Sequence, residues 1–333
     1  MKKILTIVIP TYNMQDYLRR CLDSLIVSKE QIKHIEVLII NDGSKDESSL
    51  IAHEYQNKFP DTFKVIDKEN GNYGSCVNRG LKEATGKYIK ILDADDWFDT
   101  DSFNDLIIKL EKIDVDVVLT NFDIINQVNC SIAKQVKYQN LADGVICDLE
   151  KDMVFTKIKD LQMHSITYKV DLLKQIGYRQ TEGISYTDQE WIFYPMFKAN
   201  SIVYFDISVY RYLVGREGQT MDPHIMEKSI SHRIIGAQAM FSFFEQNEHL
   251  IEGNERKSYL CGKLLGRLRY LYKYYLLMSN KETDLTPLKN IDTLIRQNKI
   301  NLQLLKTCVS KTNFIPYILY WRIFHKRLPS FFI

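Results

Sequence analysis

The chain has 333 residues, of which 45% are hydrophobic and 26% are charged, and its net charge is +2. This composition is typical of a globular protein with a full core and room for two domains, and it excludes a disordered or fibrous chain. The charge is uneven, because residues 1–225 hold 27 Lys/Arg and 34 Asp/Glu whereas residues 226–333 hold 17 and 8. We expect the acidic first part and the basic second part to have separate roles.

The cysteines and the apolar runs indicate where the protein works. The six cysteines are scattered and form no C-x-x-C pair, so neither a zinc site nor a disulfide framework is expected, and a reducing, cytoplasmic compartment fits. The N-terminal apolar run covers only residues 4–9 and is typical of a strand rather than a signal peptide. Nowhere do about 18 apolar residues follow one another, so no membrane-spanning helix is predicted.

Strands and helices alternate along the first part. The predicted strands are 4–10, 35–40, 63–67, 87–92, 115–120 and 201–212, and the predicted helices are 16–27, 46–58, 75–84, 102–112 and 191–199. This order predicts an α/β domain over 1–225, with a Rossmann-like, mostly parallel sheet and helices on both faces. Residues 121–186 show no clear period. Residues 226–333 have helical spacing and form the predicted basic, mostly helical C-terminal region.

Polar residues follow the predicted strands at one edge of the sheet. The loops read PTYN (10–13), NDGSKD (41–46), KENGNYGSCVNRG (68–80) and DADDW (93–97). In open α/β sheets this edge binds ligands. The acids of DADDW could form a solvated turn, but the apolar residues around them favour a divalent cation with oxygen ligands. Neither a G-x-G-x-x-G nor a G-x-x-x-x-G-K-[ST] motif is present, which argues against a dinucleotide site or a P-loop.

Four motifs in this order, TIVIPTYN, IINDGSKD, DADDW and YTDQEW, resemble the family 2 glycosyltransferases of GT-A fold over about residues 3–225. The resemblance implies an inverting, metal-dependent enzyme with a nucleotide-sugar donor, usually a UDP-sugar, and Mg²⁺ or Mn²⁺ as cofactor. It implies Asp95 as the metal ligand, Asp93 near the ribose or the metal, and Asp42 at the base or ribose. The implied donor-binding residues are Pro10, Thr11, Tyr12, Asn13, Asp42, Asn70, Gly71, Asn78, Arg79, Asp93, Ala94, Arg211, Arg216 and Gln219.

One part of the donor segment departs from the family pattern. Many members carry an Arg just before the Asn of the segment that resembles GNYGSCVN, and this chain has Val77 there and Arg79 on the other side of Asn78. The alternative for Asn70 and Asn78 is local capping of the loop.

The segment ISYTDQEW (184–191) carries the predicted catalytic base. Thr187 and Glu190 fit a T-x-x-E capping box, so a helix is expected to begin at Asp188, where the helix dipole favours a carboxylate. By the resemblance, Asp188 takes the proton from an acceptor hydroxyl during a single in-line displacement. The alternative is an ordinary acidic residue in a first helical turn. Candidate acceptor contacts are His164, Tyr186 and Trp191, of which Tyr186 and Trp191 could stack on a sugar ring. A lone histidine is more often a structural or surface residue, and Trp191 could equally belong to the core.

The basic C-terminal region has two readings. Aromatic residues beside Lys and Arg in 256–333 are typical of a helix at an anionic lipid surface, and acceptors in the family are often lipid-linked glycans or cell-envelope polysaccharides. The other reading is a helical bundle with an aromatic core. Nucleic-acid binding is not expected, because no recognised module appears. Two rival functions are a sugar nucleotidylyltransferase, which normally has a glycine-rich N-terminal loop, and a non-catalytic binding or scaffold protein.

Overall fold

The computed structural model describes residues 2–216, 229–279, 282–309 and 315–329. The chain divides into two compact units, Met1–Gln219 and Thr220–Ile333. The boundary predicted at 225/226 lies outside the described residues, so it stays a prediction.

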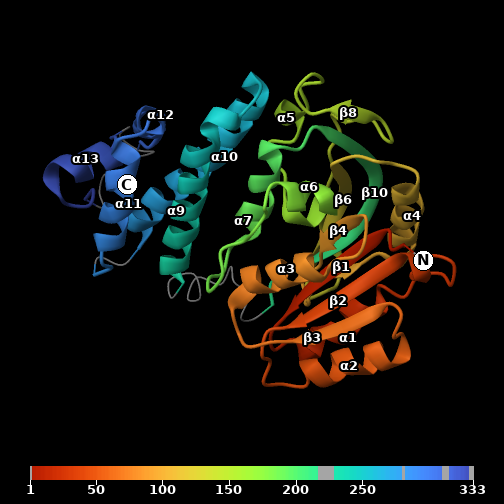
Figure 1. Cartoon of the computed structure of the whole chain (residues 1–333). Helices are drawn as coiled ribbons and strands as arrows, with labels where there is room; N and C mark the ends of the chain where they lie inside the picture. The colour runs from red at the N-terminus through yellow and green to blue at the C-terminus, as the bar shows by residue number, and fades with distance from the viewer. Residues whose placement is uncertain (1, 217–228, 280–281, 310–314, 330–333) are drawn as a thin grey trace. The chain divides into compact units, whose positions relative to one another are not determined.

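The first unit is an α/β unit around one mixed sheet (Figure 1). Its strands are β1 (Leu5–Thr11), β2 (Ile35–Asn41), β3 (Phe63–Asp67), β4 (Tyr88–Ile91), β5 (Trp97–Phe98), β6 (Val117–Asn126), β7 (Ile132–Val136), β8 (Ile146–Asp148), β9 (Ile166–Lys169) and β10 (Ser201–Val214). Its helices are α1 (Gln15–Asp23), η1 (Ile32–His34), α2 (Ser48–Lys58), α3 (Asn72–Glu83), α4 (Thr100–Glu111), α5 (Val154–Lys157), η2 (Met163–Ser165), α6 (Val170–Gln175), α7 (Asp188–Trp191) and η3 (Tyr194–Phe197).

The strand order β3-β2-β1-β4-β9-β6-β10-β5 places the predicted ligand edge. Strands β1 to β4 pair in parallel, and β6 pairs in parallel with β10. The order reverses next to β1, because β2 lies on one side of it and β4 on the other, and loops that follow such neighbours border a ligand crevice in open sheets. The loops after β1 and β4 are PTYN and DADDW, so the sheet brings both motifs to the same edge.

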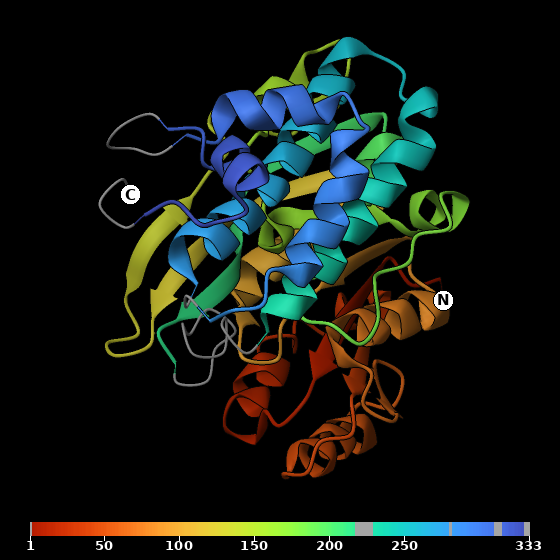
Figure 2. The same ribbon diagram turned by 90° about the vertical axis from the view of Figure 1, so that its left-hand side faces the viewer.

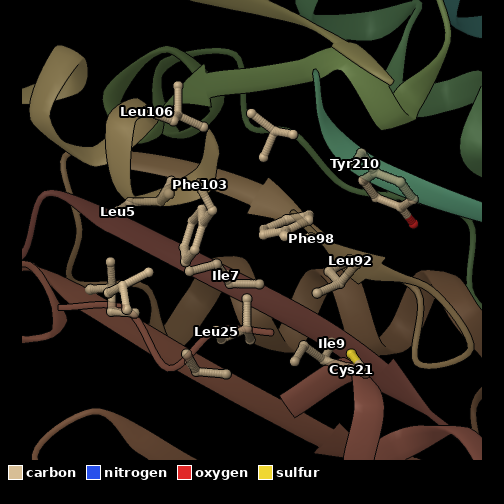
Figure 3. Packing of buried hydrophobic residues seen from close by; sticks show 14 of the residues in the cluster. Leu5, Ile7, Ile9, Cys21, Leu25, Leu92, Phe98, Phe103, Leu106 and Tyr210 are labelled. Atoms are coloured by element: carbon tan, nitrogen blue, oxygen red, sulfur yellow. The ribbon is translucent and has the colours of Figure 1, made fainter. Parts of the chain in front are cut away.

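Alternation along β1 explains why helices cover both faces. Leu5, Ile7 and Ile9 point into a core that α1, α4 and the buried ring of Tyr210 complete, as Figure 3 shows. Val8 points the other way, against Gly80 of α3. A strand buried on both faces needs a continuous apolar run, which is what the sequence of β1 provides. The predicted fold class is confirmed.

The middle of the unit differs from the expectation. Residues 121–186 contain β7, β8 and β9, and β9 runs antiparallel between β4 and β6. The helix predicted over 191–199 is absent: α7 ends at Trp191 and a 3₁₀ turn covers Tyr194–Phe197. Pro195 explains this, because proline cannot donate a helical hydrogen bond and disfavours helical geometry in the residue before it.

The described part of the second unit is helical, as predicted. It consists of α9 (Ile230–Asn247), η4 (Glu248–Leu250), α10 (Asn254–Lys273), the π-helical turn η5 (Tyr274–Met278), α11 (Thr286–Arg296), α12 (Ile300–Thr307) and α13 (Tyr317–Phe324). Figure 2 shows these helices from a second direction, and α9 packs against both α10 and α11.

A buried acid ties three helices of this unit together. Asp292 of α11 is 2% exposed and accepts hydrogen bonds from Tyr272 of α10 and from Arg322 of α13 at 2.6 Å. A buried carboxylate is costly unless it is paired. No helix among the described residues combines the length and the hydropathy needed to cross a membrane.

Candidate functional site

The loop after β4 is held by a buried acid that the sequence analysis did not single out. Asp96 is 1% exposed, and its carboxylate accepts hydrogen bonds from the Tyr210 hydroxyl and the Leu213 amide of β10, both at 2.7 Å. Burial, with repulsion from Asp95 and Asp93, raises the pKa of Asp96 well above its usual range. Asp96 therefore anchors the DADDW turn to β10.

Asp93, Asp95 and Asp96 of the DADDW loop form the acidic group, and Asp93 contacts α3. Its Oδ1 accepts a hydrogen bond from the Tyr73 hydroxyl of α3 at 2.7 Å. Burial, with repulsion from Asp95, raises the pKa of Asp93 to about 7, and the negative charge of Asp188 also raises it. Burial and the Asp93 carboxylate raise the pKa of Tyr73 well above its usual range, and the charge of Asp188 adds to this shift. Asp188, more than ninety residues along the chain, thus lies within electrostatic reach of the DADDW loop.

Asp95 forms an ion pair with Arg216. Arg216 Nε donates to Asp95 Oδ2 at 2.6 Å, and both side chains are largely buried. The Arg216 guanidinium also lies 5.4 Å from the centre of the Tyr17 ring. The start of the loop after β10 therefore meets the DADDW loop. Contact of Arg216 with a diphosphate stays a prediction.

The side chain of His164 is buried beside Asp93 and Asp96 and does not form part of an exposed surface. The side chain is 8% exposed and stacks on Tyr212, with ring centres 4.3 Å apart. One ligand atom each from Asp93, Asp96 and His164 lie within 4.8 Å of one another. Asp93 was the residue expected near the ribose or the metal, whereas Asp96 and His164 were not foreseen as ligands. The ligand role predicted for Asp95 stays a prediction.

The chemistry of Asp93, Asp96 and His164 fits a divalent cation. Burial, with repulsion from the Lys90 charge, lowers the pKa of His164 to about 3, and a metal ligand must be unprotonated. His164 Nδ1 is buried and has no hydrogen-bond partner among the described residues. The partly buried carboxylate of Asp93 and the buried one of Asp96 repel one another at this distance, and a bound cation would relieve that repulsion. Because an imidazole nitrogen joins the two carboxylates, the set suits Mn²⁺ better than Mg²⁺, which prefers oxygen ligands.

Lys90 lies buried beneath this group and was not foreseen as a site residue. Its ammonium donates to the carbonyl oxygens of His164 at 2.8 Å and Ile166 at 3.1 Å. Burial lowers the pKa of Lys90 to about 7. These two bonds hold the turn that carries His164 against β4. A lysine inside an apolar strand was the available signal, since lysine is seldom fully buried without a structural reason.

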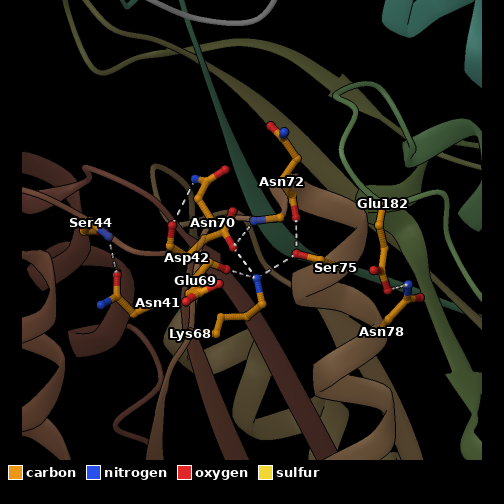
Figure 4. Close-up of polar contacts among 11 residues, drawn as sticks. Asn41, Asp42, Ser44, Lys68, Glu69, Asn70, Asn72, Ser75, Asn78 and Glu182 are labelled. Atoms are coloured by element: carbon orange, nitrogen blue, oxygen red, sulfur yellow. Dashed lines mark hydrogen bonds and ion pairs between the residues drawn. The ribbon is translucent and has the colours of Figure 1, made fainter.

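Asp42 lies at the end of β2, beside the first turn of α3 (Figure 4). Its Oδ1 accepts hydrogen bonds from Lys68 Nζ at 2.5 Å and from the Gly71 amide at 2.9 Å, and its carbonyl accepts from Asn70 Nδ2 at 2.9 Å. A Cβ atom at position 71 would lie 2.6 Å from Ser75 Oγ, which requires glycine there. Asn70 and Gly71 thus both bind Asp42, their predicted donor contacts stay predictions, and Lys68 is an additional residue beside Asp42.

The loop after β1 joins the loop after β2. Thr11 is buried, and its carbonyl accepts a hydrogen bond from the Asp42 amide at 2.8 Å. Asn13 has a left-handed backbone (φ 53°), and its side chain accepts from the Lys45 amide at 2.8 Å. Tyr12 is 46% exposed and therefore open to a ligand. The donor roles predicted for Pro10, Thr11, Tyr12 and Asn13 stay predictions.

Asp188 begins α7, as expected, but the predicted capping box is wrong. Thr187 makes no side-chain capping bond and instead donates to Gln180 Oε1 at 2.9 Å. The carboxylate of Glu190 accepts from the amide and the hydroxyl of Thr181, both at 2.8 Å. Both capping candidates are thus drawn to the segment 180–181, because tertiary partners there replace the local ones.

The segment 178–184, which precedes Asp188, is docked on α3. Asn78 donates to the Gln180 carbonyl at 2.9 Å and accepts from the Gln180 amide at 2.8 Å. The Gly183 amide donates to the Gly71 carbonyl at 2.9 Å, and a Cβ atom at Gly74 would meet the Thr181 carbonyl at 2.2 Å. The same helix therefore positions Asp93, through Tyr73, and the approach to Asp188.

Several predicted residues have other partners. Arg79 pairs with Glu83 at 3.1 Å, and Arg211 pairs with Asp99 at 2.9 Å and with buried Asp123. Trp191 is fully buried between Tyr168 and Tyr178. Asn78 binds the distant segment 178–184, so its observed partners are not those of the local loop capping given as the alternative. The ligand contacts predicted for Asn78, Arg79, Arg211 and Trp191 stay predictions, and each would compete with the partners given above. Ala94 is buried, Tyr186 is partly exposed, and Gln219 lies outside the described residues.

Comparison with known proteins agrees with the strand-end motifs. The sequence model of the family described as Glycosyl transferase family 2 matches residues 6–177, which is about half of the chain, and this confirms the resemblance. Glycosyltransferase GlyA of Streptococcus pneumoniae is 33% identical over 123 residues, which cover 37% of this chain and 17% of that protein. The chain spans only 17–35% of the length of the first curated relatives that it matches.

Solved structures share the fold at low sequence identity. TarS of S. aureus, residues 1–349, superposes with a TM-score of 0.67 at 19% identity, covering 96% of this chain and 86% of that one. TarS has also been solved with UDP-GlcNAc, and that structure superposes with a TM-score of 0.55. The mannosyltransferase PcManGT of Pyrobaculum calidifontis, solved with GDP-Man and Mn²⁺, has a TM-score of 0.52 at 16% identity and covers 91% of this chain and 84% of that one.

Proposed function

The chain belongs to glycosyl transferase family 2, and we propose that it transfers a sugar from a UDP-sugar to an acceptor hydroxyl with inversion. The observation that carries this proposal is the arrangement around the first turn of α3. Gly71 binds Asp42, Tyr73 binds Asp93, and the charge of Asp188 acts on both Tyr73 and Asp93. Carboxylates from three distant segments thus gather at one sheet edge, where a donor and an acceptor can meet.

Asp188 is the proposed general base. As the acceptor oxygen attacks the anomeric carbon, its proton passes to the Asp188 carboxylate, the bond from that carbon to the diphosphate oxygen breaks, and UDP leaves from the opposite face. Because the displacement is single, configuration at the anomeric carbon inverts. A carboxylate is a weak base for an alcohol, so the proton moves late, and such help is worth about 10²–10⁴-fold in rate. Gln189 Nε2 donates to Asp188 Oδ2 at 2.9 Å, which supports a fixed orientation of the carboxylate.

Asp93, Asp96 and His164 are the proposed holders of a divalent cation, with Asp95 as a further candidate. A cation bound there would neutralise the charge that develops on the departing diphosphate. The unpartnered nitrogen of His164 and the raised pKa values of both carboxylates support this assignment. PcManGT, which shares the fold, was solved with Mn²⁺, the ion that this donor set favours.

The second unit is proposed to bring the enzyme to a lipid-linked or anionic acceptor at the cytoplasmic face of a membrane. Helix α13 exposes Leu319, Ile323 and Phe324 at 42%, 59% and 57%, and the exposed Lys326 follows them. An apolar face beside cations suits anionic lipid. Flotation with anionic and with neutral liposomes tests this idea. Ile323→Glu should lower binding to anionic liposomes, and equal binding by the variant and the unmodified chain would refute the contact.

The function is tested by a thermal-shift screen of UDP, GDP, CMP and dTDP with and without Mn²⁺. Stabilisation follows affinity by mass action, so UDP with Mn²⁺ should give the largest shift. UDP release from UDP-sugars is then measured with and without candidate acceptors. Binding without release from any donor would favour a scaffold, and formation of a nucleotide sugar from a sugar phosphate would favour a nucleotidylyltransferase.

A further inference from the structure

Lys68 has all three of its donors satisfied beside Asp42. Its ammonium donates to Asp42 Oδ1 at 2.5 Å, to the Glu69 carbonyl at 2.6 Å and to Ser75 Oγ at 2.9 Å. The Ser75 hydroxyl donates a hydrogen bond to the Asn72 carbonyl at 2.7 Å, so its oxygen lone pairs are available to accept one from Lys68. An ammonium has three donors and no acceptor, and the arrangement therefore fixes Lys68 completely. Figure 4 shows the ammonium between Asp42 and Ser75.

The two oxygens of Asp42 are consequently unequal. Oδ1 accepts from Lys68 and from the Gly71 amide, which uses both of its lone pairs. Within the described parts of the chain, the backbone and ammonium donors that reach the Asp42 carboxylate both bind Oδ1, and the group beside the carboxylate that could still donate is the weak thiol donor of Cys76, whose pKa burial and the Asp42 charge raise to about 12. The Asp42 side chain is only 4% exposed, so what it offers to a ligand is a single acceptor atom.

A buried carboxylate at this place needs a compensating charge, and Lys68 supplies it. Arg79 pairs with Glu83 at the C-terminal end of α3, whereas the serine that Lys68 contacts lies in the first turns of that helix. Lys64 lies on β3, the strand that Lys68 follows, and it also pairs with Glu83. Lys68 is thus the cation that determines which oxygen of Asp42 faces outward.

Resting on the proposed function, we propose that Lys68 is a positioning residue for nucleobase selection, since it presents Asp42 Oδ2 as a fixed acceptor. A carboxylate oxygen accepts and cannot donate. The imide N–H of uracil satisfies it, whereas the ring nitrogen at the same place in cytosine brings a second lone pair against it. Sites built around one hydrogen-bonding group reject analogues that cannot complete the bond.

The sharpest test is Asp42→Asn, because the two donors that bind Oδ1, Lys68 and the Gly71 amide, predict the orientation of the new side-chain amide. Lys68 and the Gly71 amide both need an acceptor, so the amide oxygen must face them and the NH₂ group must take the place of Oδ2. The outward group then changes from acceptor to donor. We expect the variant to lose its preference for UDP and to bind CDP at least as well as UDP, with a change in the UDP/CDP affinity ratio of about tenfold or more. Isothermal titration with both nucleotides measures this ratio.

Variants of Lys68 show whether this lysine causes the preference for UDP over CDP. Lys68→Met should weaken UDP binding and lower the UDP/CDP ratio by about tenfold. Lys68→Arg should recover part of the UDP affinity and part of the UDP/CDP ratio, since the planar guanidinium keeps the charge but cannot match all three acceptors of the lysine ammonium. The control Lys64→Met should behave as the unmodified chain. In the Asp42→Asn background, Lys68→Met should reduce the preference for CDP, because only Gly71 then orients the amide.

The outcomes separate this inference from the proposed function. If the unmodified chain binds no uridine nucleotide, the proposed function itself fails. If it binds UDP but Asp42→Asn keeps the UDP preference, or Lys68→Met leaves the ratio unchanged, the role of Lys68 is refuted and the glycosyltransferase proposal stands. Asp42→Asn is nearly isosteric, so the test survives even if Lys68→Met does not fold.

Discussion

Replacing Lys90 by Met should remove a pH dependence from the stability of the first unit. Burial lowers the pKa of Lys90 from 10.5 to about 7 in the folded protein. Between these values the folded state has released the proton while the unfolded state still holds it, so the free energy of unfolding rises with pH in this window. Each pH unit is worth about 1.4 kcal/mol, which gives about 4 kcal/mol between pH 7 and pH 10. Below pH 7 both states are protonated and the effect is constant.

Urea unfolding of both proteins at several pH values between 7 and 10 measures the difference. Trp97 and Trp191 lie in the first unit and Trp321 in the second, so both proteins carry Trp321→Phe and their fluorescence then reports on the first unit. Tyrosine and cysteine titrate at high pH in both proteins, so their contributions cancel when the two free energies of unfolding are subtracted. The subtracted value should rise by about 4 kcal/mol in favour of the chain that retains Lys90. A difference that stays flat across this range would show that Lys90 is not held in the desolvated environment described above.

The control is Lys64→Met on β3. Lys64 has a side chain that is 54% exposed and pairs with Glu83 on the surface, where an ion pair is worth little. Its removal should leave the pH dependence unchanged. A similar slope change in the control would point to the overall net charge and away from the buried ammonium.

Four further outcomes follow from the site. Asp188→Asn should lower transfer by about 10²–10⁴-fold and keep UDP binding, and near-normal turnover would remove Asp188 from the role of base. Arg216→Ala should raise the donor KM by about tenfold, because a charged hydrogen-bond partner is lost, and an unchanged KM would contradict a donor contact. His164→Phe keeps the aromatic packing but removes both ring nitrogens, so thermal unfolding should no longer respond to Mn²⁺; a retained response would place the ion elsewhere. Gly74→Ala should lower the unfolding temperature and slow transfer together, since a Cβ atom there would meet the Thr181 carbonyl at 2.2 Å; an unaffected variant would show that this contact can relax.

Local pattern predicted the parts of the fold that are buried on both faces. The run over β1 is mostly apolar because both of its faces are covered, with Thr6 and Thr11 as polar exceptions, and β2 is likewise mostly apolar. The predicted bounds of β1 and β2 are therefore close to the observed ones, and the edge strand β3, which mixes buried and exposed residues, was also predicted with its observed bounds. Strand β9 could not be predicted, because ITYK is short and its place depends on pairing with β4 and β6, which lie far away in the sequence.

For the candidate site, the sequence predicted the positions of several residues but not the partners of their side chains. Motifs at strand ends placed Asp42, Asp93 and Asp95 correctly at one edge, since parallel strands bring their following loops together. The partners of each side chain were not predictable. Thr187 and Glu190 match a capping box in spacing, yet both bind residues of 180–181. Arg211 resembles a phosphate ligand in sequence, yet it lies between two acids.

The sequence by itself determined the family, the α/β order of the first unit and the loops that gather at the sheet edge. These depend on apolar periodicity and on strand-end chemistry, which are local. Only the tertiary structure decided which charged groups meet: Lys68 with Asp42, Arg216 with Asp95, and His164 with Asp93 and Asp96. The reason is physical, because a buried charge takes whatever partner the packing brings near, and sequence distance sets no limit on that choice.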